Sequence, residues 1–169
     1  MEEYQMEIIL KPYDRASERT MLRSIIAFFR VHHSRINDTE AREILANWTK
    51  EDHELYEILS DGVSAGFIRL NWRGPEVCWI EDIFVEENLR RQGIASKAIG
   101  LVEEVLQKRG VEGICMDVVP DNIPALRLYH RLGYDRLSIV TVRKDMQPFV
   151  TERREQICGM DFRVKQFND

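Results

Sequence analysis

The chain has 169 residues, of which 44% are hydrophobic and 31% charged, and these values are typical of a single globular domain over residues 1–169. Its net charge of −5 and its lack of a long apolar run exclude nucleic-acid binding and a membrane span, and its acidic N-terminus has the pattern of neither a signal peptide nor an anchor. Three cysteines, odd in number and far apart among apolar residues, indicate reduced thiols in a cytoplasmic protein rather than disulfides or a zinc site.

The first half of the chain predicts one strand, two helices and then three strands. The apolar run over residues 6–13 is strand-like, and residues 16–33 place Leu22, Ile25 and Phe29 on one helical face. A second helix begins at Thr39. The three strands that follow cover residues 54–62, 63–72 and 76–85, with turns at Asp61-Gly62 and Gly74-Pro75.

The second half predicts alternating helices and strands. A third helix follows a loop and stops at Gly110, and a short helix begins at Asn122 and ends before Gly133. Three further strands are predicted over residues 113–119, 136–146 and 157–167. This order predicts an α/β fold in which a mixed, mostly antiparallel sheet of about seven strands carries helices on both faces.

Positive charge and a flexible residue meet in ENLRRQGIAS, residues 87–96, at the start of the third helix. A helix start of this kind points unpaired N–H groups at one place, which suits a phosphate. The spacing from Arg90 to Gly93 and Ala95 is, taken alone, equally typical of an ordinary helix start with solvated arginines. It lacks the lysine of a P-loop and the three glycines of a dinucleotide site.

A second motif lies about thirty residues later. It reads Asn-x-x-Ala-x-x-Leu-Tyr-x-x-x-Gly-Tyr from Asn122 to Tyr134, and it follows the strand IEDIFV and the loop LRRQGIAS in that order. Together these segments resemble the GNAT superfamily of acyl-CoA-dependent N-acetyltransferases. The close resemblance covers roughly residues 80–134, and the flanking regions agree only in the order of their elements.

The resemblance implies a binding site for acetyl-CoA. The backbone of Ile83, Phe84 and Val85 would pair with the pantetheine arm as a strand does, and the Val85 N–H would polarise the thioester carbonyl. Asn122 would bond to the arm, or cap its own helix, or both. The pyrophosphate would lie on the helix start, which comprises Arg90, Arg91, Gln92, Gly93, Ile94, Ala95 and Ser96. The four histidines have no metal-ligand spacing, so no metal is expected.

Tyr129 is the candidate general acid, and the resemblance also places it among the residues that bind acetyl-CoA. Its position on an apolar helical face is by itself typical of a core tyrosine. In the family, a tyrosine at this place returns a proton to the departing thiolate, and a phenol of pKa near 10 can protonate a thiolate whose acid has a pKa of about 8.5.

Glu81 and Asp82 are the candidate general bases. An alkyl ammonium of pKa about 10.4 must lose a proton before it can attack, which costs roughly 4–5 kcal/mol at pH 7. Neighbouring strand residues point to opposite faces, so only one of the two acids can face the acceptor unless a bulge intervenes. Family members with an acid at the first position favour Glu81. The alternative is that either carboxylate is paired with an arginine in the sheet.

These features predict an N-acetyltransferase that passes an acetyl group from acetyl-CoA to a primary amine, with a small cationic amine as the favoured acceptor. Two alternatives stay open: an enzyme acting on protein α- or ε-amines, and a non-catalytic acyl-CoA-binding module with a regulatory role. The sequence does not name the acceptor. It also leaves the oligomeric state open, although the two C-terminal strands offer an edge through which a homodimer could form.

Overall fold

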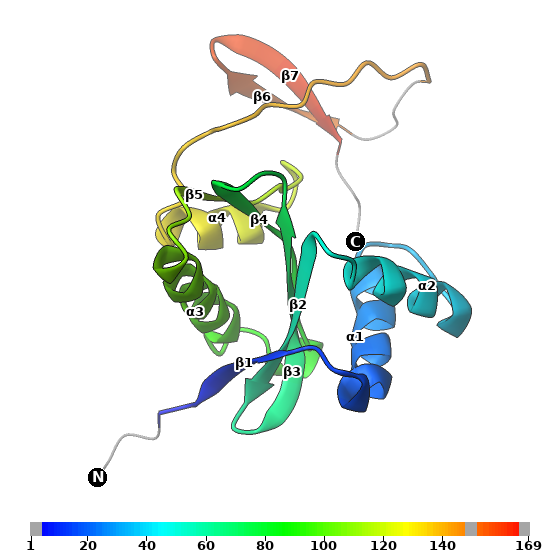
Figure 1. The fold of residues 1–169 in the computed structure, drawn as a ribbon. Coiled ribbons are helices and arrows are strands. Elements are labelled where there is room, and N and C mark those ends of the chain that lie inside the picture. Colours follow the sequence, from blue (N-terminus) through cyan, green and yellow to red (C-terminus); the bar gives the residue numbers. More distant parts are fainter. Residues whose placement is uncertain (1–4, 148–151, 166–169) are drawn as a thin grey trace. The chain divides into compact units, whose positions relative to one another are not determined.

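The computed structural model describes residues 5–147 and 152–165, and the chain divides into two compact units, residues 1–117 and 118–169 (Figure 1). The helices and strands of the first unit are β1 Ile8–Pro12, α1 Glu18–Val31, α2 Asp38–Trp48, β2 His53–Ser60, β3 Val63–Trp72, β4 Val77–Val85, α3 Ile94–Lys108 and β5 Gly113–Cys115. Short 3-10 turns at Arg15–Ser17 and Glu87–Leu89 precede α1 and α3. The second unit contains α4 Ile123–Arg131, β6 Glu152–Ile157 and β7 Met160–Lys165.

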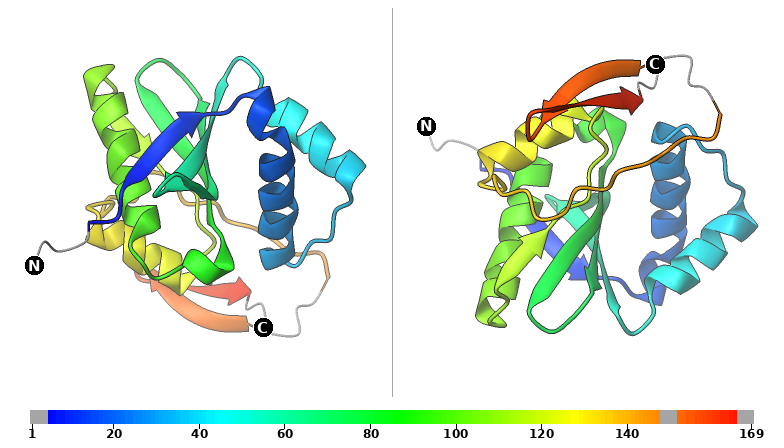
Figure 2. Two further views of the ribbon diagram at one scale, coloured as in Figure 1. Left: turned by 90° about the horizontal axis from the view of Figure 1, so that it is seen from below. Right: turned by 90° about the horizontal axis from the view of Figure 1, so that it is seen from above.

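The first unit is built on a five-stranded sheet in the order β1-β2-β3-β4-β5. Its first three strand pairs are antiparallel, and β4 and β5 are parallel. Figures 1 and 2 show α3 on one face of this sheet and α1 with α2 on the other. The predicted mixed, mostly antiparallel sheet with helices on both faces is therefore confirmed, with five strands in the central sheet rather than about seven.

The face of the sheet that carries α1 and α2 has an aromatic core. The ring of Phe67, which is fully buried on β3, lies 5.5 Å from Phe28, 5.3 Å from Trp48 and 5.7 Å from Phe84 between ring centroids. These four residues come from α1, α2, β3 and β4, so one aromatic cluster joins both helices to the two central strands. Burying large aromatic surfaces is the main source of stability at such a joint.

Helix α3 covers the opposite face. Its buried residues recur every three or four positions and form one apolar stripe: Ile94, Ala98, Ile99, Val102 and Leu106. Its last turn is also fixed to the sheet, because the Glu54 carboxylate of β2 accepts hydrogen bonds from Arg109 at 2.5 Å and from the Trp72 indole at 2.9 Å. This arrangement holds the axis of α3 and therefore the direction in which its N-terminus points.

The last strands differ from the prediction. Residues 157–167 were expected to form one strand, but Ile157 ends β6, and Cys158 and Gly159 form a hairpin turn with φ of 52° and 76° before β7 begins. Residues 166 and 167 lie outside the described residues. Strand β5 is also shorter than predicted, since it covers three residues.

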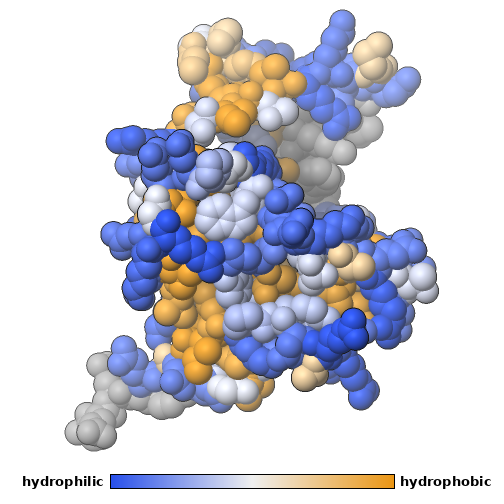
Figure 3. All heavy atoms as spheres, viewed as in Figure 1, coloured by the Kyte–Doolittle hydropathy of each residue, from blue (hydrophilic) through white to orange (hydrophobic). Residues whose placement is uncertain are grey.

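Residues 136–146 were predicted to be a strand and form none. Alternating apolar residues favour an extended chain, but a strand also needs a hydrogen-bonded partner, and no partner pairs with this segment in the described part of the chain. Its apolar side chains are consequently exposed, with Leu137 at 82% and Met146 at 83%. In Figure 3, hydrophobic residues lie among hydrophilic ones both where Figure 1 draws β6 and β7 and where it draws the sheet and α3.

Candidate active site

The N-terminus of α3 is prepared to receive an anion by its backbone alone. Gly93 is the N-cap with φ of 81°, and Arg91 also adopts a left-handed conformation with φ of 61°. Left-handed residues in such a turn make successive N–H groups converge. No side chain of the described residues caps this helix, whereas α2 has a complete capping box between Asn37 and Glu40. The first N–H groups of α3 therefore remain available to an external acceptor.

The residues of the predicted phosphate loop differ in what they can offer. Arg90 is engaged with the preceding strand, because its Nε donates to the Val85 carbonyl at 2.9 Å and its guanidinium lies 5.7 Å from the centroid of the Phe84 ring. Arg91 and Gln92 are exposed, while the side chain of Ile94 is buried. Ile94 can therefore contribute only backbone groups, and Arg91 supplies an exposed positive charge.

Strand β4 has an open edge next to this loop. It pairs with β5 only over Val77–Trp79, and its edge from Ile80 to Val85 has no strand partner among the residues described. The Phe84 carbonyl points at β3, since a Cβ added to Gly66 would lie 1.9 Å from its oxygen. Backbone groups alternate in direction along a strand, so those of Ile83 and Val85 face the open edge. The predicted pairing with pantetheine thus has two outward-facing residues, with Phe84 between them turned inward.

A β-bulge at Glu81 places both candidate bases on one face of the sheet. Arg69 pairs with Asp82 and Leu70 pairs with Ile80, so Glu81 is an extra residue in β4. Arg69 and Asn71, two residues apart on β3, point to the same face and bond to Asp82 and Glu81 respectively. This is the face that carries α1 and α2, because the Arg69 guanidinium lies 4.8 Å from the Trp48 ring. Because of the bulge, both acids, and not only one of them, point to the same face of the sheet.

Asp82 is held by one arginine through one oxygen. Arg69 donates to its Oδ2 from Nε at 2.7 Å and from Nη2 at 2.6 Å, and both side chains are largely buried, at 12% and 17% exposure. Burial raises the pKa of Asp82 above its usual value, although Arg69 opposes this shift. Arg69 Nη1 also lies 3.2 Å from His53 Nδ1. Because an arginine side chain can only donate hydrogen bonds, His53 Nδ1 is the acceptor of this one.

Glu81 has more partners, and they also share one oxygen. Its Oε1 accepts from Asn71 at 2.7 Å and from Arg73 Nη2 at 2.5 Å. Burial pushes the pKa of Glu81 upward, but the hydrogen bonds from Asn71 and Arg73 outweigh it and hold the pKa below its usual value. In each acid these partners bond to one oxygen. Glu81 Oε2 and Asp82 Oδ1 take no part in the bonds described above.

Sequence reasoning missed the basic and amide partners of the two acids. The alternative of an arginine-paired carboxylate is what the structure contains at both positions, and such a pair is compatible with a role as base. A signal was present at the end of β3, where Arg69 and Asn71 alternate with Leu70 and Trp72 and Arg73 follows directly. That alternation indicates a strand with one polar face, opposite the acids of the next strand.

Tyr129 and Asn122 lie in the second unit. The side chain of Asn122 accepts from the Ala125 N–H at 3.2 Å, so its predicted role as the N-cap of α4 is confirmed. Tyr129 is half-buried, and its ring lies edge-on to Tyr134 at 6.4 Å between centroids. Its neighbours on the helix face, Ala125 and Leu128, are half-buried as well. The approach of Tyr129 to the two acids remains a prediction.

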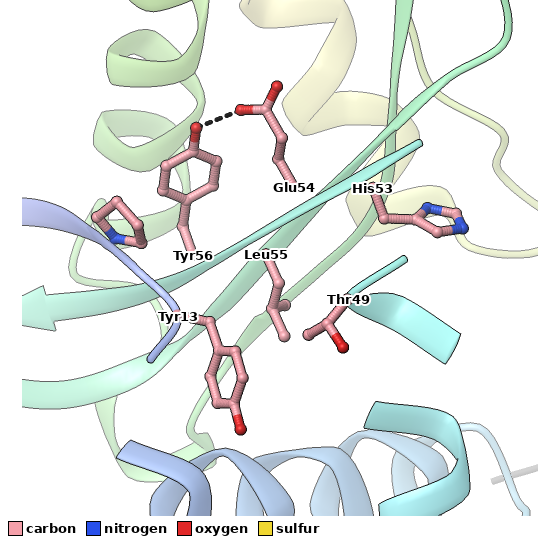
Figure 4. A pocket seen from close by; sticks show the side chains of 7 residues that line it. Tyr13, Thr49, His53, Glu54, Leu55 and Tyr56 are labelled. Atoms are coloured by element: carbon pink, nitrogen blue, oxygen red, sulfur yellow. Dashed lines mark hydrogen bonds between the residues drawn. The ribbon is translucent and has the colours of Figure 1, made fainter. Parts of the chain in front are cut away.

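A separate hollow of about 290 Å³ opens near the start of β2. Figure 4 shows Glu54 and Tyr56 on one side of the strand and Leu55 with Tyr13 and Thr49 on the other. The Tyr56 hydroxyl donates to Glu54 at 2.5 Å, as drawn there. Neither Glu81 nor Asp82 lines this hollow, so it is distinct from the candidate site.

Neither a metal site nor a membrane-spanning helix lies within the described residues. In residues 5–147 and 152–165, no group of three or more His, Cys, Asp or Glu side chains is placed to hold a metal ion. Over the same residues, no helix combines the length and the apolar character needed to cross a membrane.

Comparison with known proteins agrees with this geometry. A family model described as Acetyltransferase (GNAT) family matches residues 19–134. An acetyltransferase of Agrobacterium fabrum is 27% identical over 125 residues, which cover 74% of this chain and 80% of that protein. The thialysine N-epsilon-acetyltransferase of Sus scrofa is 39% identical over 67 residues. These residues make up 40% of this chain and only 39% of that enzyme. The fold is shared with a solved aminoglycoside N-acetyltransferase in complex with CoA, which has a TM-score of 0.61, is 18% identical, and aligns over 87% of this chain and 100% of that one.

Proposed function

This chain belongs to the acetyltransferase (GNAT) family of acetyl-CoA-dependent enzymes, and we propose that it transfers the acetyl group directly to a small cationic primary amine. We further propose that residues 1–169 act as one catalytic domain, because the family match runs from the first unit into the second. The observation that carries the choice of acceptor is the bulge at Glu81, which turns two carboxylates to one face beside the open edge of β4.

The chain's own groups fit acetyl-CoA at two places. The uncapped N-terminus of α3 at Gly93 offers N–H groups to the pyrophosphate, and Arg91 adds charge. The open edge of β4 offers the backbone of Ile83 and the N–H of Val85 to the pantetheine arm, while the Val85 carbonyl accepts from Arg90. When bound, acetyl-CoA supplies an activated thioester carbonyl to the site. The Val85 N–H is then the donor placed to stabilise the negative charge that develops on that carbonyl oxygen.

The two acids would prepare the amine for attack. An ammonium is attracted to the face where Glu81 and Asp82 lie, and it must lose one proton before it can act as a nucleophile. We assign this proton to Glu81, whose Oε2 takes no part in the bonds to Asn71 and Arg73, with Asp82 as the second candidate. The raised pKa of Asp82 makes it the stronger base, and the two side chains are equally exposed, at 17%, so variants of the two separate these roles.

Tyr129 would complete the reaction. In this proposal its hydroxyl returns a proton to the thiolate as the amide forms, so the overall transfer consumes no external acid. Asn122, which already caps α4 through Ala125, fixes the start of the helix that carries Tyr129.

The acceptor class is supported by charge. In this proposal Glu81 and Asp82 both face the acceptor, and the chain has a net charge of −5. Relatives and structural neighbours are named for amine acceptors: a thialysine N-epsilon-acetyltransferase among the former and an aminoglycoside N-acetyltransferase among the latter. A carboxylate pair lowers the free energy of a bound cation, and a neutral amine gains nothing from it.

The test is thiol release from acetyl-CoA across a panel of linear diamines, an aminoglycoside, lysine and a short peptide, for the wild type and Tyr129→Phe. We expect turnover with small polycations and a loss of about 10²-fold or more in Tyr129→Phe at unchanged affinity for acetyl-CoA. Turnover on the peptide alone would assign the enzyme to protein amines. Binding of acetyl-CoA without turnover on any amine would favour a regulatory module.

A further inference from the structure

The guanidinium of Arg73 lies among three groups that together attract a cation. It donates to Glu81 Oε1 from Nη2 at 2.5 Å and to Asp117 Oδ2 at 3.0 Å. Its central carbon also lies 4.5 Å from the centroid of the Trp79 ring, the distance of a cation–π contact. Trp79 and Asn71 are paired across β3 and β4, so this ring shares the face of the sheet on which Glu81 lies.

One aromatic face and two carboxylates make a site for an organic cation. Such a combination binds alkylammonium groups, because the ring quadrupole and both negative charges favour positive charge at one point. In the structure the site, which we call the Trp79 cage, is filled by a side chain of the chain itself. The cage adjoins the carboxylate to which we assign the acceptor's proton, so an acceptor that reaches Glu81 meets Arg73 there.

Arg73 is free to leave the cage. It follows the last residue of β3, in the turn before β4, and its side chain is 39% exposed. Asp117 is 65% exposed, and ion pairs between such exposed groups add little net stability. Glu81 does not depend on Arg73 for its position, since Asn71 already donates to the same oxygen at 2.7 Å.

We propose that Arg73 is an internal competitor for the acceptor: its guanidinium fills the Trp79 cage in the free protein and is displaced when the acceptor's cation enters. This inference rests on the proposed function, since it names a residue that sets the specificity of the same site. It makes Arg73 a filter, because a polar neutral molecule cannot repay the loss of Arg73's contacts and a cation can.

The kinetic test compares Arg73→Gln with Arg42→Gln, which removes an equal charge from the exposed pair between Arg42 and Glu18. The acceptors are 1,4-diaminobutane and trifluoroethylamine, which is uncharged at neutral pH. We expect Arg73→Gln to lower KM for the diamine by about two- to five-fold with little change in kcat, and to lower KM for trifluoroethylamine at least as much, because the variant no longer excludes an uncharged amine from the cage. Trp79→Leu should raise KM for the diamine, because the cage loses its ring. A KM that stays the same or rises in Arg73→Gln overturns the proposal.

A second measurement does not depend on turnover. The Nε–H signal of Arg73, identified by its absence in Arg73→Gln, is followed by NMR while diamine is added to the wild type bound to CoA. We expect the signal to move and to exchange faster with water as the hydrogen bond from Nε to Glu81, 3.2 Å long here, is lost. Turnover with an unmoved signal would disprove the role of Arg73 but would not contradict the proposed function. A moved signal without turnover on any amine would disprove the proposed function, but it would still support the cage as a site that binds the diamine.

Discussion

The N-terminus of α3 and the bulge of β4 are prepared for opposite charges in different ways. At α3 the preparation lies in the backbone, since Gly93 and Arg91 adopt left-handed conformations and no described side chain caps the helix. At the bulge it lies in side chains, since Arg69 holds Asp82, while Asn71 and Arg73 hold Glu81. The anion site is thus shaped by conformation, and the cation site by a network of ion pairs.

The difference determines how each site responds to substitution. A site made of N–H groups changes only when the path of the main chain changes. A site made of paired carboxylates changes with each charge, because removing one member leaves the other buried without compensation.

The largest effect is expected in Glu81→Gln. Loss of the base should lower kcat/KM for a diamine by about 10²- to 10³-fold near neutral pH, and the rate should recover as pH rises, because the amine then deprotonates unaided. The measurement is a pH–rate profile of thiol release for the wild type and the variant. A ratio that is constant with pH would assign Glu81 a structural role only, and the same profile in Asp82→Asn shows whether the neighbouring acid is the base.

The next effect concerns stability at the bulge. Arg69→Gln leaves Asp82 largely buried without its cation and should cost about 2–4 kcal/mol in the free energy of unfolding. The measurement is urea unfolding followed by circular dichroism. The matched control is Arg42→Gln, since Arg42 and Glu18 are 61% and 37% exposed and their pair should contribute little. Equal effects of the two substitutions would contradict the network.

A smaller effect is expected at α3. In Gly93→Ala the new side chain must adopt φ of 81°, so the turn should relax and the dissociation constant for CoA should rise about 10-fold. The control is Gly100→Ala, because Gly100 lies within α3 and an added Cβ would meet nothing within 4 Å. Calorimetric titration with CoA measures both. The account of the anion site fails if Gly93→Ala binds CoA as the control does.

The smallest effect is in the pH dependence of stability. The pKa of Glu81 is lowered, so its contribution is present above its unfolded pKa and is lost as pH falls through the folded one. The pKa of Asp82 is raised, so its contribution is present below its unfolded pKa and is lost as pH rises through the folded one. Between about pH 3 and pH 7, the gain in unfolding free energy should therefore be smaller in Glu81→Gln and larger in Asp82→Asn than in the wild type.

Unfolding curves of the three proteins at several pH values test these signs. Changes of the same sign in both variants would mean that the two acids do not differ in environment as described.

The backbone conformation at the proposed anion site could be predicted from the sequence because its determinants are local. A glycine before an amphipathic helix predicts the uncapped helix start, and Gly93 forms it. The same holds for Asn122, whose position before α4 predicts the cap that it makes with Ala125. Both features depend on residues within four positions of each other, and such patterns are visible in a single sequence.

The cation site could not be predicted in full because its determinants are distant. The bulge depends on the register between Arg69 and Asp82, and the cage joins Arg73 to Asp117 over 44 positions. Residues 136–146 illustrate the same limit, since their alternating pattern is strand-like and yet forms no strand without a partner. Local pattern sets the preference of a segment, and pairing decides its state.

The central claim is that a carboxylate at the bulge takes the proton of a cationic amine. It is tested most directly by the ratio of kcat/KM between the wild type and Glu81→Gln at one neutral pH, measured for primary amines of high, intermediate and low pKa. The account predicts a ratio near one for an amine that is already uncharged and a steady rise with amine pKa, because only an ammonium needs the base. The same ratio for every amine would contradict it.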